Sequence, residues 1–445
     1  FPSPTRGEAM LPRLEVDLSP LGRREMSAPP IGLGIAGLGM AGAVMVQAAA
    51  AHAGYVLRAA ADPHPAPRAA FARDFNAMVY DDIGALCADP AVEVVYIATP
   101  HQFHAPHAIL AAEQGKHVIL EKPMALTLAD CDAIIAAVEH YRVHLIVGHT
   151  HSFDPAVHVM WLLIASGALG RLGMIHSFNY TNFLYRPRRP EELDTARGGG
   201  ILFNQVPHQI DIVRFLGGGL VKSVRAQTTV LDPTRPTEGS CAALMQFENG
   251  AAASLVYGGY DYFDSDEWHF GISERGAPKK IDHGAARRAL LKTVDETRAR
   301  TETFAYGSSK GDLPPHQPHF GVTIATCERA ELRGTADGVM QYDETGAHEI
   351  KIERGPCMPG RCQVLDEMGR ALRLGVRPIH DGRWGKATLE VALAIQESAA
   401  AGREVALKHQ VEVPPEETTP GENEGDVIAS VRIADRPSRG LYAKD

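Results

Sequence analysis

Short apolar runs alternate with alanine-rich segments from Ile31 onward. Five of the runs have the length and composition of buried strands and cover residues 31–37, 55–61, 92–98, 116–121 and 144–149. The segments between them carry apolar residues at helical spacing and cover residues 40–52, 66–74, 104–115 and 127–141. Strands that alternate with helices in this way build a parallel sheet with helices on both faces. We therefore predict a doubly wound α/β domain over residues 29–152.

The pattern changes beyond residue 153. Strand-like runs then follow one another with few helices between them, at 174–185, 221–231, 240–248 and 251–260. Consecutive strands of this kind are typical of an antiparallel sheet. We expect residues 153–412 to form an α+β domain with a large, mainly antiparallel, open sheet.

Three other stretches of the second domain depart from this strand pattern. One helix is expected to interrupt the sheet at 198–219, a stretch bounded by glycine triplets. Residues 277–318 are rich in charge, proline and glycine, and they predict an irregular insertion. Two amphipathic segments, 361–374 and 384–401, predict further helices, and the last of them is a candidate to pack back on the first domain.

Composition limits the classes of partner. The chain has 445 residues, of which 45% are hydrophobic, and a formal net charge of −10, which gives no attraction to nucleic acid or to an anionic membrane surface. It contains no secretory leader pattern and no long uncharged apolar segment. The six cysteines are scattered, so we expect reduced thiols and a cytoplasmic location. The ends, 1–28 and the acidic 413–445, are expected to be disordered.

The first chemical motif is a glycine-rich turn that follows the first predicted strand and opens the first predicted helix. Glycines in this context allow a tight turn and let the backbone approach a pyrophosphate, whose charge is favoured at a helix N-terminus. Asp62 ends the second predicted strand, where a carboxylate can accept hydrogen bonds from the adenosine ribose and repel a 2′-phosphate. We predict a Rossmann domain that binds NAD through Gly37, Gly39, Met40, Ala41, Gly42 and Asp62. Arg68 could reach a phosphate, so NADP stays an alternative.

Two further side chains at the expected cleft suit proton and charge handling. Lys122 follows Glu121 at the carboxyl end of a predicted strand, the edge where open α/β sheets bind ligands. A lysine shielded from water there can stabilise a developing alkoxide. His208 lies on the glycine-bounded helix, one turn after Asn204, and suits general acid–base catalysis near neutral pH. Taken alone, each is more often a surface lysine or a structural histidine.

Together these motifs resemble the Gfo/Idh/MocA oxidoreductases. The resemblance rests on the glycine turn, on Thr99-Pro100 followed by His104, on Gly115-Lys116-His117-Val118 leading into Glu121-Lys122-Pro123, and on the helix with His208. It implies that Lys122 and His208 are the catalytic pair, and that the nicotinamide side of the cleft is lined by Thr99, Pro100, His104 and Glu121. It also implies a Lys122–Pro123 bond that is often cis and a homo-oligomer, dimer or tetramer, in which the second domain often supplies the interface.

One position departs from the family pattern. The family usually has aspartate four residues before the catalytic histidine, where this chain has Asn204, which is expected to be the third catalytic residue because an amide can orient the substrate or the imidazole. An amide carries no charge and would not raise the pKa of His208 as a carboxylate does, so the departure favours a neutral imidazole able to act as base. Asp211, three residues after His208, is expected to be secondary.

Within the family, residues 318–330 and 380–395 most resemble the branch known as phthalate 4,5-cis-dihydrodiol dehydrogenases. An aromatic-acid diol would need cationic partners, and four arginines precede the catalytic helix, at Arg186, Arg188, Arg189 and Arg197. A solvated loop explains these arginines equally well. The residues expected to contact substrate are Arg186, Arg197, Asn204, His208 and Trp384.

The sequence therefore predicts an NAD-dependent dehydrogenase that oxidises a secondary alcohol or a cyclic cis-diol, including an aromatic-acid cis-dihydrodiol. A sugar, glycoside or cyclitol dehydrogenase with the same catalytic residues is one alternative, and a non-catalytic dinucleotide-binding sensor is another. No metal is predicted, because of His101, His104 and His107 only His104 matches the family pattern and no carboxylate accompanies them at a fixed spacing.

Overall fold

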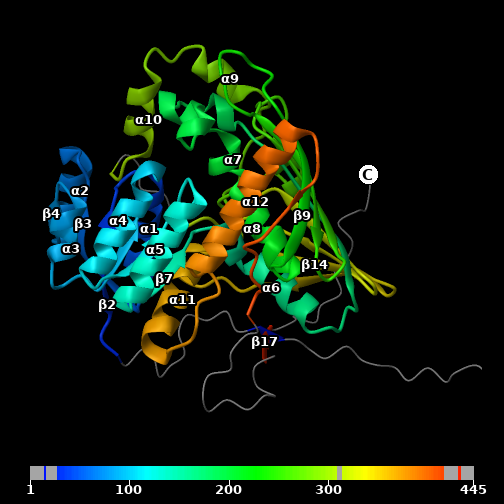
Figure 1. Ribbon diagram of the computed structural model, residues 1–445, viewed down its shortest axis with the longest axis horizontal. Coiled ribbons are helices and arrows are strands. Elements are labelled where there is room, and N and C mark those ends of the chain that lie inside the picture. Colours follow the sequence, from blue (N-terminus) through cyan, green and yellow to red (C-terminus); the bar gives the residue numbers. More distant parts are fainter. Residues whose placement is uncertain (1–14, 17–27, 308–312, 415–428, 432–445) are drawn as a thin grey trace, which may run out of the picture.

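Two sheets organise the protein, and Figure 1 shows the Rossmann part and the larger sheet side by side with helices between them. This computed structural model describes residues 15–16, 28–307, 313–414 and 429–431. The ends expected to be disordered lie almost wholly outside the described residues. Of these ends, the structure describes a short parallel pair, β1 (Glu15–Val16) with β17 (Ala429–Val431), and disorder of the remaining residues stays a prediction.

The first sheet has six parallel strands in the order β4-β3-β2-β5-β6-β7. Its strands are β2 (Ile31–Ala36), β3 (Tyr55–Ala61), β4 (Met78–Tyr80), β5 (Val94–Ile97), β6 (His117–Leu120) and β7 (Leu145–Val147). Its helices are α1 (Met40–Ala51), α2 (Pro65–Phe75), α3 (Ile83–Ala88), α4 (His104–Glu113) and α5 (Leu128–Tyr141). The predicted parallel sheet is confirmed. Only β4 and α3 were missing from the prediction, because each is too short to show a period.

The second sheet has nine strands in the order β15-β14-β13-β12-β8-β11-β10-β9-β16. The strands are β8 (Leu172–Tyr180), β9 (Val221–Thr229), β10 (Ser240–Phe247), β11 (Ala252–Gly258), β12 (Val322–Cys327), β13 (Glu331–Gly334), β14 (Gly338–Asp343), β15 (Gly346–Lys351) and β16 (Val405–Ala406). All neighbours are antiparallel except β8 and β11. The expected large, mainly antiparallel sheet is therefore confirmed, and it takes strands from both sides of the insertion.

One face of this sheet is covered and the other is open. Buried and exposed residues alternate along β10, which is what a sheet covered on one face requires. The covering helices are α6 (Pro155–Ala165), α8 (Val206–Gly217) and α12 (Gly382–Ala401), which Figure 1 shows in front of the strands. Within the described part of the chain, no helix is both long and apolar enough to cross a lipid bilayer.

The single helix expected at 198–219 is instead two helices, α7 (Gly200–Asn204) and α8, separated at Gln205. The physical reason is Pro207, which has no N–H and cannot continue the hydrogen-bond ladder of α7. As a result, the N–H of His208 donates to the carbonyl of Gln205 at 3.0 Å rather than to that of Asn204. The carbonyl of Asn204 is thereby left available to another donor.

The insertion at 277–318 is partly helical and reaches back to the first domain. It contains α9 (Ala285–Leu290) and α10 (Glu296–Phe304), which Figure 1 shows at the top of the view, above both sheets. After α10, the N–H of Tyr306 donates to the carbonyl of Leu38 at 2.8 Å, and its ring packs edge-on against Phe71. The insertion therefore bridges the second domain and the glycine turn.

The predicted helices at 361–374 and 384–401 appear as α11 (Arg361–Leu374) and α12, and both pack on the first domain, α11 against α1 and α12 against α5. A disulfide joins Cys357 to Cys362, so the expectation of reduced thiols is wrong for this pair. The turn into α11 brings their Cα atoms to 6.1 Å, within reach of a disulfide, which the spacing alone did not indicate. The other four cysteines are free and buried.

A buried carboxylate, that of Asp211 on α8, ties the second domain to the chain that leaves β7. One of its oxygens accepts from the indole N–H of Trp384 at 2.7 Å and from the hydroxyl of Thr388 at 2.9 Å, both on α12. The other accepts from the hydroxyls of Thr150, at 2.5 Å, and of Ser152. All four donors point at one carboxylate, which makes this network strong.

We predict that Asp211→Asn destabilises the protein. Its amide NH2 would face hydroxyl and indole donors, so at least one buried donor would lose its acceptor, at a cost of about 1–3 kcal/mol in the free energy of unfolding. Urea denaturation followed by circular dichroism measures the change. Asp381→Asn is the matched control, because Asp381 caps the start of α12 and asparagine caps a helix equally well. Equal stability of the two variants would contradict the prediction.

Candidate active site

A cavity of about 1020 Å³ lies between the two sheets. Its floor is the carboxyl edge of the parallel sheet, with the glycine turn, Asp62, Thr99 and Lys122. Its opposite wall comes from α8 and from the segment between β8 and α7, and α10 contributes Arg300 and Thr301. The insertion therefore closes over part of the cavity.

The glycine turn has the shape that a dinucleotide requires. Gly37 has a φ of +95°, and a Cβ there would meet the carbonyl of Ala98 at 2.7 Å. Gly42 packs against the carbonyl of Gly37, while a Cβ on Gly39 would meet nothing within 4 Å. The cavity is lined by Gly37, Gly39, Met40 and Ala41, whereas Gly42 packs against the turn. No side chain caps α1, so its first N–H groups are available to a pyrophosphate.

The side chain of Asp62 is hydrogen-bonded to the glycine turn. Its carboxylate accepts from the N–H of Leu38 at 2.7 Å and from the N–H of His64 at 2.8 Å, and it lines the cavity. Arg68 donates to the backbone carbonyl of Asp62, so its guanidinium is partly occupied there. The carboxylate keeps lone pairs that a ribose hydroxyl could use.

The residues expected on the nicotinamide side all line the cavity, with different partners. Thr99 contacts the imidazole of His107 at 3.0 Å, and Pro100 opens the turn that leads to α4. The imidazole of His104 is fully buried between the carbonyls of Pro123, at 2.8 Å, and Thr99, at 2.9 Å. This histidine therefore holds together the segments that follow β5 and β6.

Glu121 and Lys122 stand at the end of β6 in different surroundings. Glu121 accepts from the hydroxyl of Tyr96 and from Arg361 at 3.2 Å. Burial by itself would raise the pKa of Glu121, but the charges of Arg361 and Lys122 bring it below its usual value. The Lys122–Pro123 peptide bond is cis, as the resemblance implied.

Lys122 reaches across to the second domain. Its ammonium donates to the backbone carbonyl of Asn204 at 2.5 Å, the acceptor that the interruption between α7 and α8 leaves available. Burial lowers the pKa of Lys122 to about 8, against the opposing effect of Glu121 and Glu274. The side chain of Asn204 turns the other way and donates to the carbonyl of Gly200 at 2.8 Å.

His208 lines the same cavity from α8, so the structure brings the two predicted catalytic residues together. Burial and the neighbouring charge of Lys122 hold the pKa of His208 well below its usual value. Its Nδ1 atom is buried without a hydrogen-bond partner. The carboxylate of Asp211 binds Trp384 and Thr388 on one oxygen and Thr150 and Ser152 on the other, and its secondary role stays a prediction.

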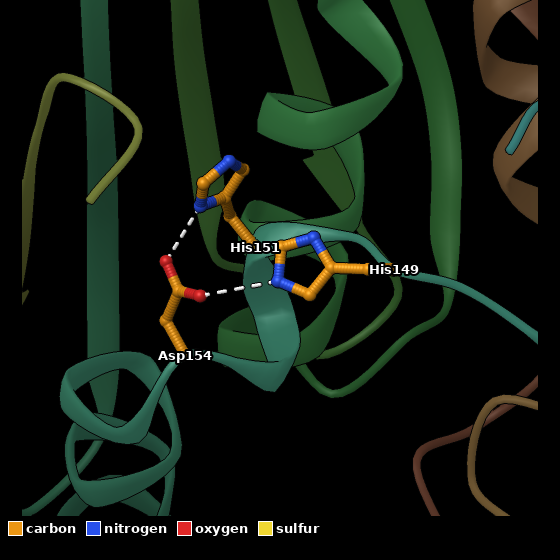
Figure 2. Close-up of side chains that lie close together, drawn as sticks. All are labelled: His149, His151 and Asp154. Carbon is orange, nitrogen blue, oxygen red and sulfur yellow. Dashed lines mark hydrogen bonds and ion pairs between the residues drawn. The ribbon is translucent and has the colours of Figure 1, made fainter. Parts of the chain in front are cut away.

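A second group of ionisable residues, missed in the sequence, faces His208. Figure 2 shows His149 and His151 turned toward one carboxylate, that of Asp154. The Nδ1 of His151 lies 2.6 Å from one oxygen of Asp154, and the Nε2 of His149 lies 3.4 Å from the other. The available signal was His149 at the carboxyl end of the last strand, the edge where ligands bind. Asp154 directly precedes Pro155 at the start of α6, a place where an aspartate usually caps a helix.

The ligand atoms of His149, His151 and Asp154 lie within 4.8 Å of one another, close enough to surround a metal ion. Each carboxylate oxygen, however, already faces an imidazole nitrogen. The charge of Arg361 also acts on His149 and on His208, and that of Lys122 acts on His208. Nearby cations disfavour a bound cation and favour hydrogen bonding as the explanation of the cluster.

The predicted substrate residues separate into two groups. Arg186 and Arg197 line the cavity, and within the described ranges neither forms an ion pair with a carboxylate; Arg186 donates to the side chain of Asn182 at 2.7 Å. Arg188 and Arg189 line it too, but both pair with Glu192. Trp384 is 1% exposed, lies beneath Arg214 and does not line the cavity. Its indole was expected to face substrate, but α12 turns it into the core.

Comparison with known proteins agrees with this geometry. A family model described as the oxidoreductase family with an NAD-binding Rossmann fold (GFO/IDH/MocA) matches residues 31–149, and a model of the GFO/IDH/MocA C-terminal domain matches residues 159–270. A 1-carboxy-3-chloro-3,4-dihydroxycyclohexa-1,5-diene dehydrogenase from Comamonas testosteroni is 40% identical over 375 residues, 82% of this chain and 94% of that protein.

Solved structures show the same fold. A crystal structure of a protein from Bordetella bronchiseptica RB50 is 44% identical to this chain and has a TM-score of 0.82. The match covers 85% of this chain and all of that one. Levoglucosan dehydrogenase in complex with NADH and levoglucosan is 21% identical, with a TM-score of 0.64 over 87% of this chain and all of that one, and shares the fold.

The fold, the glycine turn and the cavity define an NAD(P)-dependent oxidoreductase that acts on CH–OH groups. The chain belongs to the Gfo/Idh/MocA family. NAD is its cofactor, and when bound it supplies the nicotinamide ring that accepts a hydride.

We predict unequal effects of two substitutions at the Lys122–Asn204 contact. Lys122→Ala removes the ammonium that stabilises a developing alkoxide and should lower kcat about 100-fold or more. Asn204→Ala keeps the carbonyl that Lys122 uses and should lower kcat less than about tenfold. Steady-state formation of NADH at 340 nm measures both, and NADH fluorescence checks that cofactor binding persists. Equal losses in the two variants would show that the amide itself takes part.

Proposed function

We propose that this enzyme oxidises a cyclic cis-dihydrodiol that carries a carboxylate, the cis-dihydrodiol of an aromatic acid, and forms the corresponding catechol. The observation that carries the proposal is the pair of arginines in the cavity, Arg186 and Arg197, which have no carboxylate partner in the part of the chain that the structure describes. Guanidinium groups pair with carboxylates in bidentate geometry. The similarity to a dehydrogenase of a carboxylated dihydroxycyclohexadiene supports the same substrate class.

Lys122 and His208 have different roles at the substrate oxygen that reacts. Lys122 donates to that oxygen and stabilises the negative charge that develops as the hydroxyl proton leaves. His208 is neutral at physiological pH, because burial and Lys122 disfavour its protonated form, and it can therefore accept the proton. The C–H bond of the same carbon breaks as a hydride, and the resulting dienone becomes aromatic by loss of the adjacent ring proton to oxygen.

The geometry also explains why both domains are needed. Lys122 comes from the parallel sheet and His208 from α8, so the substrate oxygen can meet both only in the cavity between the sheets. The cover formed by α10 and Tyr306 limits the access of water to this space. Holding the reacting atoms in near-attack geometry should supply much of the rate enhancement.

A sugar or cyclitol dehydrogenase is the second candidate. Neutral hydrogen-bonding side chains line the cavity next to the arginines and include Asn179, Thr181, Asn182 and Gln205. Polyols need many such groups, whereas a carboxylated diol needs a cation. The two candidates therefore differ in the contribution of Arg186.

We predict that the purified enzyme with NAD oxidises a carboxylated cis-dihydrodiol faster than the same diol without its carboxylate, myo-inositol or glucose. Arg186→Leu should raise KM for the carboxylated diol by about 10- to 100-fold, because one charged pair is lost, and should leave KM for the neutral diol nearly unchanged. NADH absorbance at 340 nm provides both measurements. Turnover of the polyols alone, or equal effects of Arg186→Leu on both diols, would favour the second candidate.

We also propose that the chain forms a homo-oligomer, dimer or tetramer, in the cytoplasm and has no nucleic-acid partner. The open face of the nine-stranded sheet supports an interface between copies. Leu244 and Met174 point from it to solvent with 50% and 46% of their surface exposed. An exposed apolar sheet face of this kind is typical of protein–protein contacts.

We expect Leu244→Glu to weaken this assembly, because a carboxylate would have to be buried against an apolar partner. Light scattering after size exclusion should show a smaller mean mass for this variant. Leu231→Glu is the matched control, because Leu231 is 69% exposed but lies beyond the end of β9. A wild-type protein that is monomeric at micromolar concentration would contradict the proposed assembly.

A further inference from the structure

His151 has the surroundings of an acid–base residue. It sits in the short turn η3 (His151–Phe153) between β7 and α6, is 5% exposed and lines the cavity. Its Nδ1 lies 2.6 Å from Asp154, and its Nε2 lies 3.5 Å from Glu274. Its ring centroid lies 4.9 Å from that of His208 in an edge-to-face arrangement.

His208 lacks the support that His151 has. Its Nδ1 has no hydrogen-bond partner, and the side chain four residues before it, that of Asn204, is an amide turned toward Gly200. A proton that His208 takes from substrate is therefore poorly stabilised where it lands. The nearest histidine with a carboxylate on Nδ1 is His151.

We propose that His151, oriented by Asp154, is a second proton-transfer residue of the reaction and the site at which the hydroxyl proton comes to rest. The O–H bond of the substrate breaks and an N–H bond forms on His208. That N–H bond then breaks, and one forms at Nε2 of a His151 that starts neutral, while its Nδ1–H donates to Asp154. The hydride leaves separately for NAD, so protons and electrons balance.

The two histidines beside Asp154 behave differently because their neighbours differ. Burial and the charge of Arg361 lower the pKa of His149 to about 4, so it stays neutral. Burial also disfavours a charge on His151, but Asp154 and Glu274 outweigh it and raise the pKa of His151 to about 9. Of the two, His151 is therefore the one that can hold a proton at physiological pH.

The position of His151 is fixed from two sides. Asp154 binds the Nδ1 atom of the His151 ring. Asp211 accepts from the hydroxyls of Thr150 and Ser152, the residues on either side of His151 in the chain. The titratable or charged groups that act on it from the elements around it are Asp154 and His149 from its own connection, His208 from α8, Glu274 from the segment after η7 (Ser265–His269), and His319 from the segment before β12.

The inference depends on the oxidation of a CH–OH group and not on the identity of the diol. If the wild-type enzyme oxidises some alcohol but no carboxylated diol, the proposed substrate fails while the role of His151 can still be measured. If the wild-type enzyme oxidises the diol and His151 is dispensable, only this inference fails.

The test is the pH dependence of kcat for wild type, His151→Ala and Asp154→Asn. Loss of His151 should lower kcat about 100-fold and remove the rise of the rate with pH, and added imidazole should restore part of the activity. Asp154→Asn should move this rise to lower pH, because removal of the carboxylate lowers the pKa of His151. An unchanged profile in Asp154→Asn, or an unchanged kcat in His151→Ala, overturns the proposal.

A second measurement needs no turnover. Nitrogen-15 NMR of labelled histidines in the NADH complex should show His151 protonated at pH 8 in the wild type and neutral in Asp154→Asn. His52→Ala is the control, because the buried His52 forms a comparable pair with the half-buried Asp366, at 2.9 Å, outside the cavity. It should lose stability without a change in the pH profile. A divalent metal that stays on the wild-type protein after chelator dialysis, with His151 neutral, also overturns the proposal.

Discussion

The buried ammonium group of Lys122 needs a hydrogen-bond acceptor. Its acceptor is the carbonyl of Asn204, and much of this structure depends on that contact. The carbonyl of Asn204 is available only because Pro207 ends the ladder of α7 and sends the N–H of His208 to Gln205 instead. One missing hydrogen bond therefore sets the position of His208 and gives Lys122 a partner across the gap between the two sheets. The contact joins the domains at the point where substrate and cofactor must meet.

Other contacts fix the elements that surround the Lys122–Asn204 contact. Asp211 binds donors from α12 on one oxygen and from the connection after β7 on the other, so α8 and the turn with His151 share one buried anchor. Tyr306 brings the insertion back to the glycine turn through the carbonyl of Leu38. A cavity of this size between two sheets stays ordered only if several elements fix its walls at once.

Charge in the cavity is decided by neighbours and not by residue type. Burial lowers the pKa of both His149 and His151. Arg361 adds to this effect at His149, whereas Asp154 and Glu274 outweigh it at His151, so the two pKa values shift in opposite directions. The aspartate that the family usually places before the catalytic histidine is Asn204 here, and the carboxylates beside the neighbouring His151, those of Asp154 and Glu274, come from other segments of the chain. A site can thus change its charge pattern without a change of fold.

The sequence by itself determined the parallel sheet and the glycine turn with Asp62, because these follow from local periodicity and from a motif with fixed spacing. It was the resemblance to a family that pointed to Lys122 and His208 as a pair. The sequence could not show that Trp384 turns into the core, that Asp211 is an anchor, or that His151, Asp154 and Glu274 meet beside His208. Glu274 is more than a hundred residues from His151 in the chain, and no local pattern encodes such a meeting. Only packing across the two sheets decides which side chains face the same cavity, and the charge of each then depends on those neighbours.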